Sequence, residues 1–270
     1  MDSYRIALFG GVYNNYLALE AVCREARSRG ISDIYCLGDM GAFGPFPDRV
    51  FPLLDEYDVH CIKGNYDDSV ARGLDNCQCG YTDPTDNYFA RLSYDYTLNN
   101  TSAANRRFLA SLPDSLYLQD SGVKTLLCHG SPRRVNEFLW ESTTPTHLLE
   151  TFCERYDADV ILATHTGLHW KRELAQNRLF ANVGVIGRPA NDGRTNVWYT
   201  IVDFGKQPGA GKTPSRPRVD FVPLDYDFRR LASDMRSENL PEEFVRTVLS
   251  GWWTTCLEIL PYKERVIGKH

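Results

Sequence analysis

Four short polar clusters, far apart in the sequence, carry side chains suited to binding a metal ion. They are Gly38-Asp39, Gly64 to Asp67, Cys128 to Arg134 and Thr164 to His169. Each follows a short apolar run typical of a buried strand. A carboxylate, an amide oxygen and imidazoles brought together would suit a divalent transition metal such as Mn, Fe or Zn. A lone His at the end of a strand would indicate little, because it is more often a hydrogen-bonded structural residue.

The elements expected to position these clusters follow the strand–helix alternation of a layered α/β domain. Apolar runs predict strands at 6–9, 34–37, 59–62, 124–128, 160–163, 178–182, 195–203 and 218–223. Helical spacing of apolar residues predicts helices at 16–29, 48–57, 105–111, 146–156, 227–238 and 241–249. Open α/β sheets build their sites at the carboxyl ends of strands, so the four clusters are expected to meet there.

Three other segments bear on the organisation of the chain. Residues 71–97, rich in Gly, Pro, Asp and Asn, predict an insertion lying over a surface, and 205–217 predict a linker or hairpin tip. Trp252 and Trp253 are interpreted as a helix face packed on the core, or as a roof over the pocket. We expect a main domain over 1–226 and a C-terminal helical appendage, 227–270, packed on it.

Bulk composition narrows the classes of function. The 270 residues are 43% hydrophobic with a net charge of -5 and no Lys/Arg-rich run, which argues against nucleic acid as a partner. No stretch approaches the ~20 apolar residues that a membrane helix needs, and the N-terminus lacks the features of a signal peptide. We therefore expect no membrane partner.

The eight cysteines are scattered, and several lie in apolar runs, as Cys36 and Cys128 do. This predicts buried reduced thiols and a cytoplasmic location. Cys77 and Cys79 are the close pair, but a one-residue spacing is poor for a structural zinc site. We expect them to anchor a loop, with metal or redox use as the alternative.

The order and spacing of the polar clusters resembles the calcineurin-like metallophosphoesterase family. The family pattern runs Asp-x-His, Gly-Asp, Gly-Asn-His-Asp, His-Gly and Gly-His-x-His, and its flanks resemble Tyr35 to Asp39, Ile62 to Asn65 and Leu126 to Pro132 here. The resemblance covers residues 4–203, with further similarity at 219–244. It implies a layered α/β/β/α sandwich of two mixed sheets flanked by helices.

The resemblance also implies a ligand set for one divalent metal ion per chain. The positions that match the ligands of one family metal are Asp39, Asn65, His129 and His165, and all four residue types are retained. An ion held there would support hydrolysis of a phosphate ester by metal-activated water.

The other family metal position has lost most of its ligands. Gly11, Tyr13 and Gly167 stand where the resemblance places an Asp, a His and a His. Two replacements stay open as weak ligands: His169, two residues further along, and a Tyr13 phenolate. Phenol is a poor ligand at its usual pKa of ~10.

The resemblance extends to residues that would contact substrate. Tyr66 replaces a His found in many relatives and fits a branch with Gly-Asn-Tyr-Asp in the third block. We predict Asn65, Tyr66 and Arg133 as catalytic residues, and Asn15, Arg133 and Arg134 as substrate-binding residues. The alternatives are packing for Tyr66, a solvated face for the two arginines and a helix cap for Asn15.

Two functions remain open, and we favour the first. One is a metal-dependent phosphoesterase that hydrolyses a phosphate monoester or diester. The other is a catalytically inactive homologue that binds a metal and a phosphorylated ligand as a sensor or regulator, because fold does not determine function. Both imply a small phosphorylated partner. The sequence does not identify the substrate or the oligomeric state.

Overall fold

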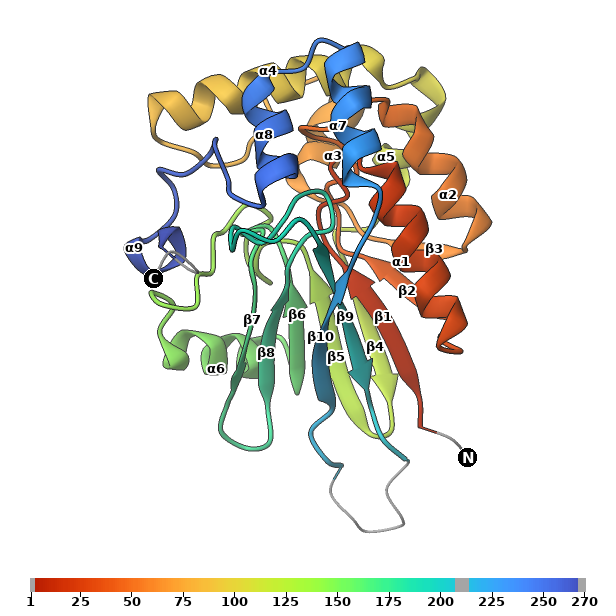
Figure 1. The fold of residues 1–270 in the computed structure, drawn as a ribbon. Helices are drawn as coiled ribbons and strands as arrows, with labels where there is room; N and C mark the ends of the chain where they lie inside the picture. The colour runs from red at the N-terminus through yellow and green to blue at the C-terminus, as the bar shows by residue number, and fades with distance from the viewer. Residues whose placement is uncertain (1–2, 207–213, 267–270) are drawn as a thin grey trace.

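A computed structural model describes residues 3–206 and 214–266 as a sandwich of two five-stranded sheets with helices on its outer faces (Figure 1). The first sheet has the order β10 (Arg218–Leu224), β9 (Val197–Asp203), β1 (Arg5–Phe9), β2 (Asp33–Cys36) and β3 (Val59–Cys61). The second has the order β4 (Ser115–Asp120), β5 (Val123–Cys128), β6 (Val160–Ala163), β8 (Leu179–Val183) and β7 (His169–Glu173).

Both sheets are mixed, as predicted. In the first, β1, β2 and β3 are parallel, while β9 runs antiparallel to β1 and β10 antiparallel to β9. In the second, β5, β6 and β8 are parallel, and the edge strands β4 and β7 are antiparallel to their neighbours. The parallel strands of each sheet therefore bring their carboxyl ends to one edge.

The helices of the described residues occupy the outer layers and the top of Figure 1. They are α1 (Tyr16–Ser28), the 3-10 turn η1 (Pro47–Arg49), α2 (Val50–Glu56), α3 (Asn65–Arg72), α4 (Pro84–Asn100), α5 (Ala103–Ser111), α6 (Thr146–Arg155), α7 (Phe228–Ser237), α8 (Glu242–Ser250) and α9 (Tyr262–Arg265).

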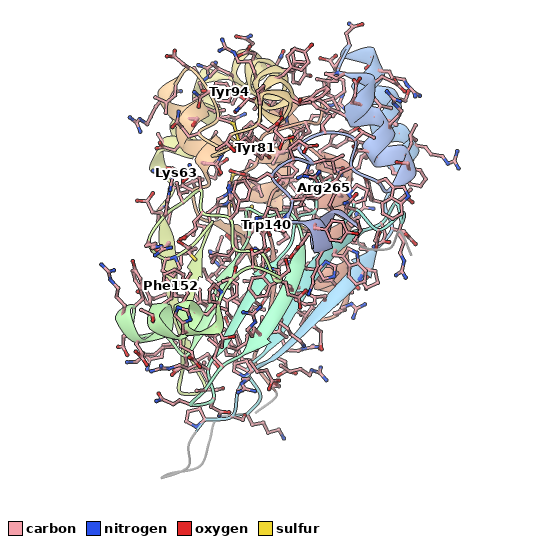
Figure 2. All side chains as sticks on the ribbon, turned by 90° about the vertical axis from the view of Figure 1, so that its left-hand side faces the viewer. Lys63, Tyr81, Tyr94, Trp140, Phe152 and Arg265 are labelled. Atoms are coloured by element: carbon pink, nitrogen blue, oxygen red, sulfur yellow. A yellow bond between two sulfur atoms is a disulfide. The ribbon has the colours of Figure 1, made fainter. Side chains whose placement is uncertain are left out.

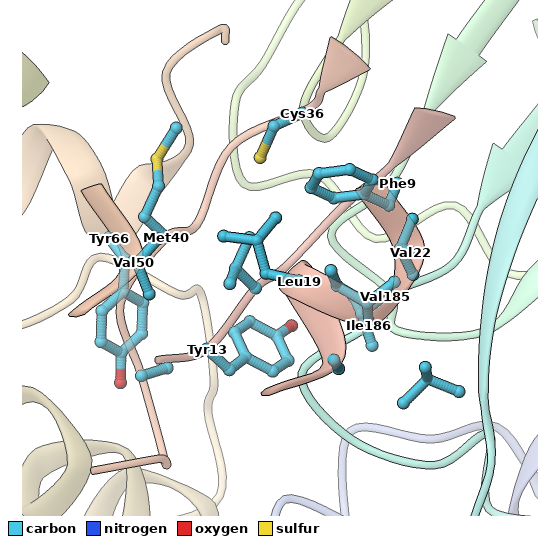
Figure 3. Close-up of a cluster of buried hydrophobic side chains, with 14 of the residues drawn as sticks. Phe9, Tyr13, Leu19, Val22, Cys36, Met40, Val50, Tyr66, Val185 and Ile186 are labelled. Carbon is cyan, nitrogen blue, oxygen red and sulfur yellow. The ribbon is translucent and has the colours of Figure 1, made fainter. Parts of the chain in front are cut away.

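The alternating directions of the side chains along β1 explain why the first sheet is covered on both faces. Ile6 and Leu8 are buried between the two sheets, whereas Ala7 and Phe9 point the other way and join the cluster that includes Leu19 of α1 (Figure 3). Successive side chains of a strand point to opposite faces, so a strand apolar throughout requires cover on both. The first sheet is thus buried between α1 and the second sheet.

Helix α6 covers the other face of the second sheet. Leu149 and Phe152 of α6 pack with Leu126, Ile161 and Phe180 from three neighbouring strands. Figure 2 shows Phe152 on α6, at the opposite end of the molecule from Tyr94 on α4. The four layers of the predicted fold class are therefore confirmed.

The segment 71–97, predicted as an insertion over a surface, contains most of helix α4. Asp83 caps the N-terminus of α4, where its side chain accepts hydrogen bonds from the backbone N–H groups of Thr85 and Asp86. Pro84 occupies the first turn of the helix. The buried positions of α4 are mostly small or polar, as Ser93 and Thr97 are. A weak apolar period explains why the helix was not predicted.

The C-terminal segment packs on the main hydrophobic cluster through α7 and α8. Leu231 and Met235 of α7 and Phe244 and Val248 of α8 are buried in that cluster. Helix α8 ends at Gly251, so Trp253 lies in the following loop and not on a helix face. A domain boundary at residue 226 stays a prediction.

The predicted hairpin tip at 205–217 connects β9 and β10. These strands pair antiparallel from Asp203 opposite Arg218 onward, while residues 207–213 of the tip lie outside the described residues. No helix in the described ranges combines the length and the apolar character that crossing a membrane requires.

The prediction of reduced cysteines is wrong at one pair. Cys77 and Cys79 form a disulfide in the loop between α3 and α4, with their Cα atoms 5.3 Å apart. That separation lies within the usual range for a disulfide, and the intervening Gln78 adopts a left-handed φ of 53°. The free cysteines of the described chain are all buried: Cys23, Cys36, Cys61, Cys128, Cys153 and Cys256.

Candidate metal centre

Strand ends of both sheets position the predicted ligands. Asp39 follows β2, and Asn65 follows β3 and begins α3; His129 and His165 follow β5 and β6 of the second sheet. All four side chains are at least nine-tenths buried. The carboxyl ends of parallel strands from two packed sheets thus bring distant residues together, as the sequence predicted.

Three of the four side chains lie in mutual contact. Nε2 of His129 is 3.2 Å from Oδ2 of Asp39 and 3.2 Å from Nδ1 of His165. The potential ligand atoms of these residues all lie within 4.8 Å of one another. Two ligands about 2.1 Å from one ion stand about 3–3.5 Å apart at usual coordination angles. The three residues therefore fit a single ion.

An orphaned polar atom supports this fit. Oδ1 of Asn65 is buried without a hydrogen-bond partner in the described chain. The amide nitrogen of Asn65 donates to the Cys77 carbonyl at 2.8 Å, which leaves its oxygen free. Nδ1 of His129 lies 2.6 Å from the Leu37 carbonyl, so Nδ1 carries the proton and Nε2 is the nitrogen available to a metal.

The electrostatics of Asp39 and His165 match what a metal requires, whereas at His129 burial lowers the pKa and the neighbouring Asp39 carboxylate raises it further, to above its ordinary value. Burial opposes ionisation of Asp39, yet neighbouring His129 holds the pKa of this carboxyl below its ordinary value. Burial and the charge of His129 lower the pKa of His165 to about 3. Metal ligands must be deprotonated carboxylate and neutral imidazole, and these two residues are held in those states.

Backbone conformation at the strand ends is adapted to this close approach. Asp39 and His165 adopt left-handed φ values of 62° and 71°, a sparsely populated region in which functional residues are often held. At Gly64 a Cβ would lie 2.2 Å from Oδ1 of Asp39, and at Gly38 it would lie 2.4 Å from the Gly64 nitrogen. Any side chain at these glycines would push the ligands apart.

Asp67 positions the centre without being one of its predicted ligands. Its Oδ2 accepts from the backbone nitrogens of Asp39 at 2.7 Å and Gly64 at 2.8 Å, and Oδ1 accepts from Met40 at 3.0 Å. Burial and the charge of Asp39 raise the pKa of Asp67 to about 6. The sequence analysis assigned this residue no role, although it lies in the Gly64 to Asp67 block.

The arginines predicted to bind substrate lie near His129. Arg133 and Arg134 line an open depression of 460 Å³, together with Lys63, Ser131 and His129. Nε of Arg133 donates to Glu137 at 2.9 Å, and Nε of Arg134 donates to Asn136 at 2.7 Å. Both guanidinium groups are thus near the candidate centre and partly paired within the protein.

The Tyr66 backbone nitrogen donates to Oδ1 of Asp39 at 3.0 Å, but the side chains of Tyr66 and Asn15 contact residues outside the ligand cluster. The Tyr66 hydroxyl donates to Oγ of Ser93 at 2.9 Å, and its ring packs in the main cluster (Figure 3). Oδ1 of Asn15 accepts from Ala18 N at 3.0 Å as the cap of α1, and Nδ2 donates to the Ile186 carbonyl. Their roles toward substrate stay predictions.

Of the two possible weak ligands, His169 does not join the cluster, whereas the role of Tyr13 stays a prediction. His169 begins β7, where its ring contacts the rings of Trp198 and Phe221 at centroid distances of 4.5 and 4.7 Å. Burial raises the pKa of the Tyr13 phenol, which disfavours a phenolate. Over residues 3–206 and 214–266, the group of Asp39, His129 and His165 is the one that brings three or more His, Cys, Asp or Glu ligands together.

Comparison with known proteins agrees with this geometry. The sequence profile described as the calcineurin-like phosphoesterase superfamily domain matches residues 5–206. An uncharacterized protein of Methanocaldococcus jannaschii is 24% identical over 251 residues, which is 88% of this chain and 94% of that protein.

Two solved structures extend the likeness over nearly the whole fold. A metallophosphoesterase from Sphaerobacter thermophilus matches with a TM-score of 0.67 at 24% identity, covering 93% of this chain and 100% of its own. A hypothetical protein from Pyrococcus horikoshii OT3 matches with a TM-score of 0.72 at 20% identity, covering 92% and 98%. The chain belongs to the calcineurin-like phosphoesterase superfamily.

Proposed function

We propose that the chain is a metal-dependent phosphoesterase that hydrolyses a phosphate monoester or diester with one divalent transition metal ion per chain. The observation that carries the proposal is the group of ligand atoms of Asp39, His129 and His165 that lie within 4.8 Å of one another, together with the orphaned Oδ1 of Asn65. Leaving a buried polar atom unpaired costs about 1–3 kcal/mol. A metal ion is a partner that would satisfy the Asn65 oxygen.

Each residue would have a distinct task. Asp39, Asn65, His129 and His165 would hold the ion, with His129 oriented by the Leu37 carbonyl. When bound, Mn, Fe or Zn would polarise a phosphoryl oxygen and lower the pKa of a water molecule.

Arg133 and Arg134 would hold the phosphoryl group in the depression beside His129. A guanidinium forms paired, charge-assisted hydrogen bonds to phosphate oxygens and neutralises charge that develops there. Arg133 would exchange its contact with Glu137 for substrate. The substrate class is a small phosphorylated molecule, and a cytoplasmic location is part of the proposal.

One observation favours the alternative, an inactive homologue that binds a metal and a phosphorylated ligand. Gly11, Tyr13 and Gly167 cannot supply the ligands of a second ion in the way that the resemblance implies. A single ion lacks the clamp that two ions about 3.5–4 Å apart place on attacking and leaving oxygens. Slow turnover or none would follow.

The test compares hydrolysis by the Mn-loaded chain and its Asp39→Ala variant. The substrates are p-nitrophenyl phosphate and bis(p-nitrophenyl) phosphate, and the control is Asp225→Ala, at an exposed carboxylate without a hydrogen bond in the described chain. We expect Mn-dependent hydrolysis that Asp39→Ala reduces about 1,000-fold or more and Asp225→Ala leaves unchanged. One Mn per chain with no turnover above the Asp39→Ala background would support the binding protein instead.

A further inference from the structure

We propose that the Arg188 guanidinium is a fixed cationic subsite for a phosphoryl oxyanion, located where the resemblance places a second metal ion. This inference rests on the proposed function, since it names a group that would bind the phosphorylated substrate or ligand. The location follows from the three altered ligand positions, Gly11, Tyr13 and Gly167, which come together around Arg188.

Contacts at the altered positions define this location. A Cβ on Gly167 would lie 3.4 Å from a terminal nitrogen of Arg188 and 2.9 Å from Cη2 of Trp253. A Cβ on Gly11 would lie 2.6 Å from the Tyr13 ring, whose centroid is 5.8 Å from the guanidinium carbon of Arg188. The space that the missing ligands would use is therefore filled by Tyr13, Trp253 and a cation.

The subsite adjoins the metal centre through the backbone. Gly167 is separated from His165 by a single residue, and the Tyr13 nitrogen donates to the Asp39 carbonyl at 3.3 Å. A phosphoryl group that contacts an ion at the centre could therefore present a second oxygen toward Arg188.

Aromatic rings hold the guanidinium in place. We define the Arg188 cage as Tyr13, Phe43, Trp253 and Arg188. The guanidinium carbon of Arg188 lies 3.4 Å from the Trp253 ring centroid and 5.1 Å from the Phe43 ring centroid. The Trp253 indole nitrogen donates to the Pro189 carbonyl at 2.6 Å, and the Gly187 nitrogen donates to the Gly11 carbonyl at 2.8 Å. Both neighbours of Arg188 in the chain are thus fixed.

The charge of Arg188 lacks an anionic partner. The side chain is 7% exposed, and it makes no ion pair or hydrogen bond with residues 3–206 or 214–266. A guanidinium cannot escape the cost of burial by losing its proton. Cation–π contacts with Trp253 recover about 2 kcal/mol at desolvated sites, less than the cost of burying an unpaired ion.

The terminal nitrogens remain available to a ligand. Nε is buried and unpartnered, whereas neither terminal nitrogen is among the buried unpartnered atoms of the described chain. Since they also form no hydrogen bond there, each keeps some exposed surface. A tetrahedral oxyanion suits such a pair, because two parallel N–H groups match two phosphate oxygens.

Binding of inorganic phosphate to the Mn-loaded full chain, measured by titration calorimetry, tests the subsite. We expect Arg188→Met, which keeps an apolar side chain of similar length, to weaken phosphate binding roughly 10- to 100-fold. Arg188→Lys should give an intermediate loss. The matched control is Arg194→Met, on the same loop with an exposed guanidinium, which should bind phosphate as the wild type does.

Two results would overturn the subsite: phosphate affinity of folded Arg188→Met within about twofold of wild type, or no phosphate binding by the wild type. If Arg188→Met does not fold, tungstate soaked into wild-type crystals decides. Tungsten beside the guanidinium supports the subsite, and its absence there overturns it. Because these readouts measure binding, loss of the proposed hydrolysis would leave them intact, and hydrolysis could persist if the subsite fails.

Discussion

The metal centre and the Arg188 cage lie at the same edge of the sandwich and differ in what fills them. At the centre, ligand atoms of Asp39, His129 and His165 face one another, and the buried Oδ1 of Asn65 lacks a partner in the described chain. In the cage, aromatic rings pack around a cation. One position holds a group of side chains that could bind an ion, while at the other aromatic rings and a cation occupy the places of the ligands.

This difference shows that side chains of the protein fill the second position. Loss of three ligands alone would leave a cavity, which costs stability in proportion to its volume. Here Tyr13 and Trp253 close the space, and Arg188 retains one positive charge there. We infer that the cage keeps the electrostatic role of a metal without its Lewis acidity.

The largest effect among the variants that test this comparison is expected for crowding at Gly64. Gly64→Ala adds a Cβ 2.2 Å from Oδ1 of Asp39, so the ligands must separate. We expect Mn affinity to fall about 100-fold or more, with about 1–3 kcal/mol of stability lost to overpacking. Gly73→Ala, where a Cβ would meet nothing within 4 Å, should keep full Mn affinity. Wild-type affinity for Gly64→Ala would contradict the metal centre.

The pH dependence of the free energy of unfolding tests whether His169 is a buried neutral side chain outside the metal centre and the Arg188 cage. Burial lowers the pKa of His169 to about 4, below the ~6.5 of an unfolded chain. As pH falls from 6.5 toward 4, the unfolded state takes up a proton that the folded state refuses. The free energy of unfolding should therefore fall by up to about 2–3 kcal/mol over this window.

His169→Phe should remove that part of the pH dependence and leave Mn content unchanged. The exposed His147 provides the control, since His147→Phe should retain the wild-type slope. Loss of Mn in His169→Phe would instead place this residue among the ligands.

A substitution that restores a family ligand in the Arg188 cage tests whether this position can bind an ion. Gly167→His and Gly73→His both force a side chain onto a left-handed backbone, with φ of 82° and 63°. Only at Gly167 must a neighbouring side chain also move, because a Cβ there would lie 2.9 Å from the Trp253 ring. We expect Gly167→His to lose about 1–3 kcal/mol more stability in denaturant unfolding, and to bind no additional Mn. A second Mn per chain would mean that the position is open.

The smallest effect is expected for the Tyr13 hydroxyl. Burial raises the pKa of this phenol, so it stays protonated and fills space with its ring (Figure 3). Tyr13→Phe should therefore change Mn affinity less than about twofold in a competitive chelator titration. A loss of about tenfold or more would identify Tyr13 as a ligand.

The sequence was sufficient to predict the fold class and the ligand cluster, because both depend on strand ends. Apolar runs identified β2, β5 and β6, and the polar residues that follow these strands, Asp39, His129 and His165, lie together in the structure. Strand β4 was not predicted, since Ser115–Asp120 alternates exposed and half-buried residues without strong apolar content.

The Arg188 cage was beyond sequence reasoning for a physical reason. Its rings come from Tyr13, Phe43 and Trp253, which no local period links, and its cation, Arg188, lies outside the four polar clusters. Tyr66 and Asn15 show the same difficulty, because the direction of a side chain at a correctly predicted element depends on tertiary contacts.

The most direct measurement is a crystal structure of the full chain at saturating Mn²⁺, with anomalous scattering to locate the ions. We predict one Mn within coordination distance of Asp39, Asn65, His129 and His165, and no anomalous peak beside Gly11, Tyr13 and Gly167. Two ions about 3.5–4 Å apart, or one ion bound by none of these four residues, would contradict the account.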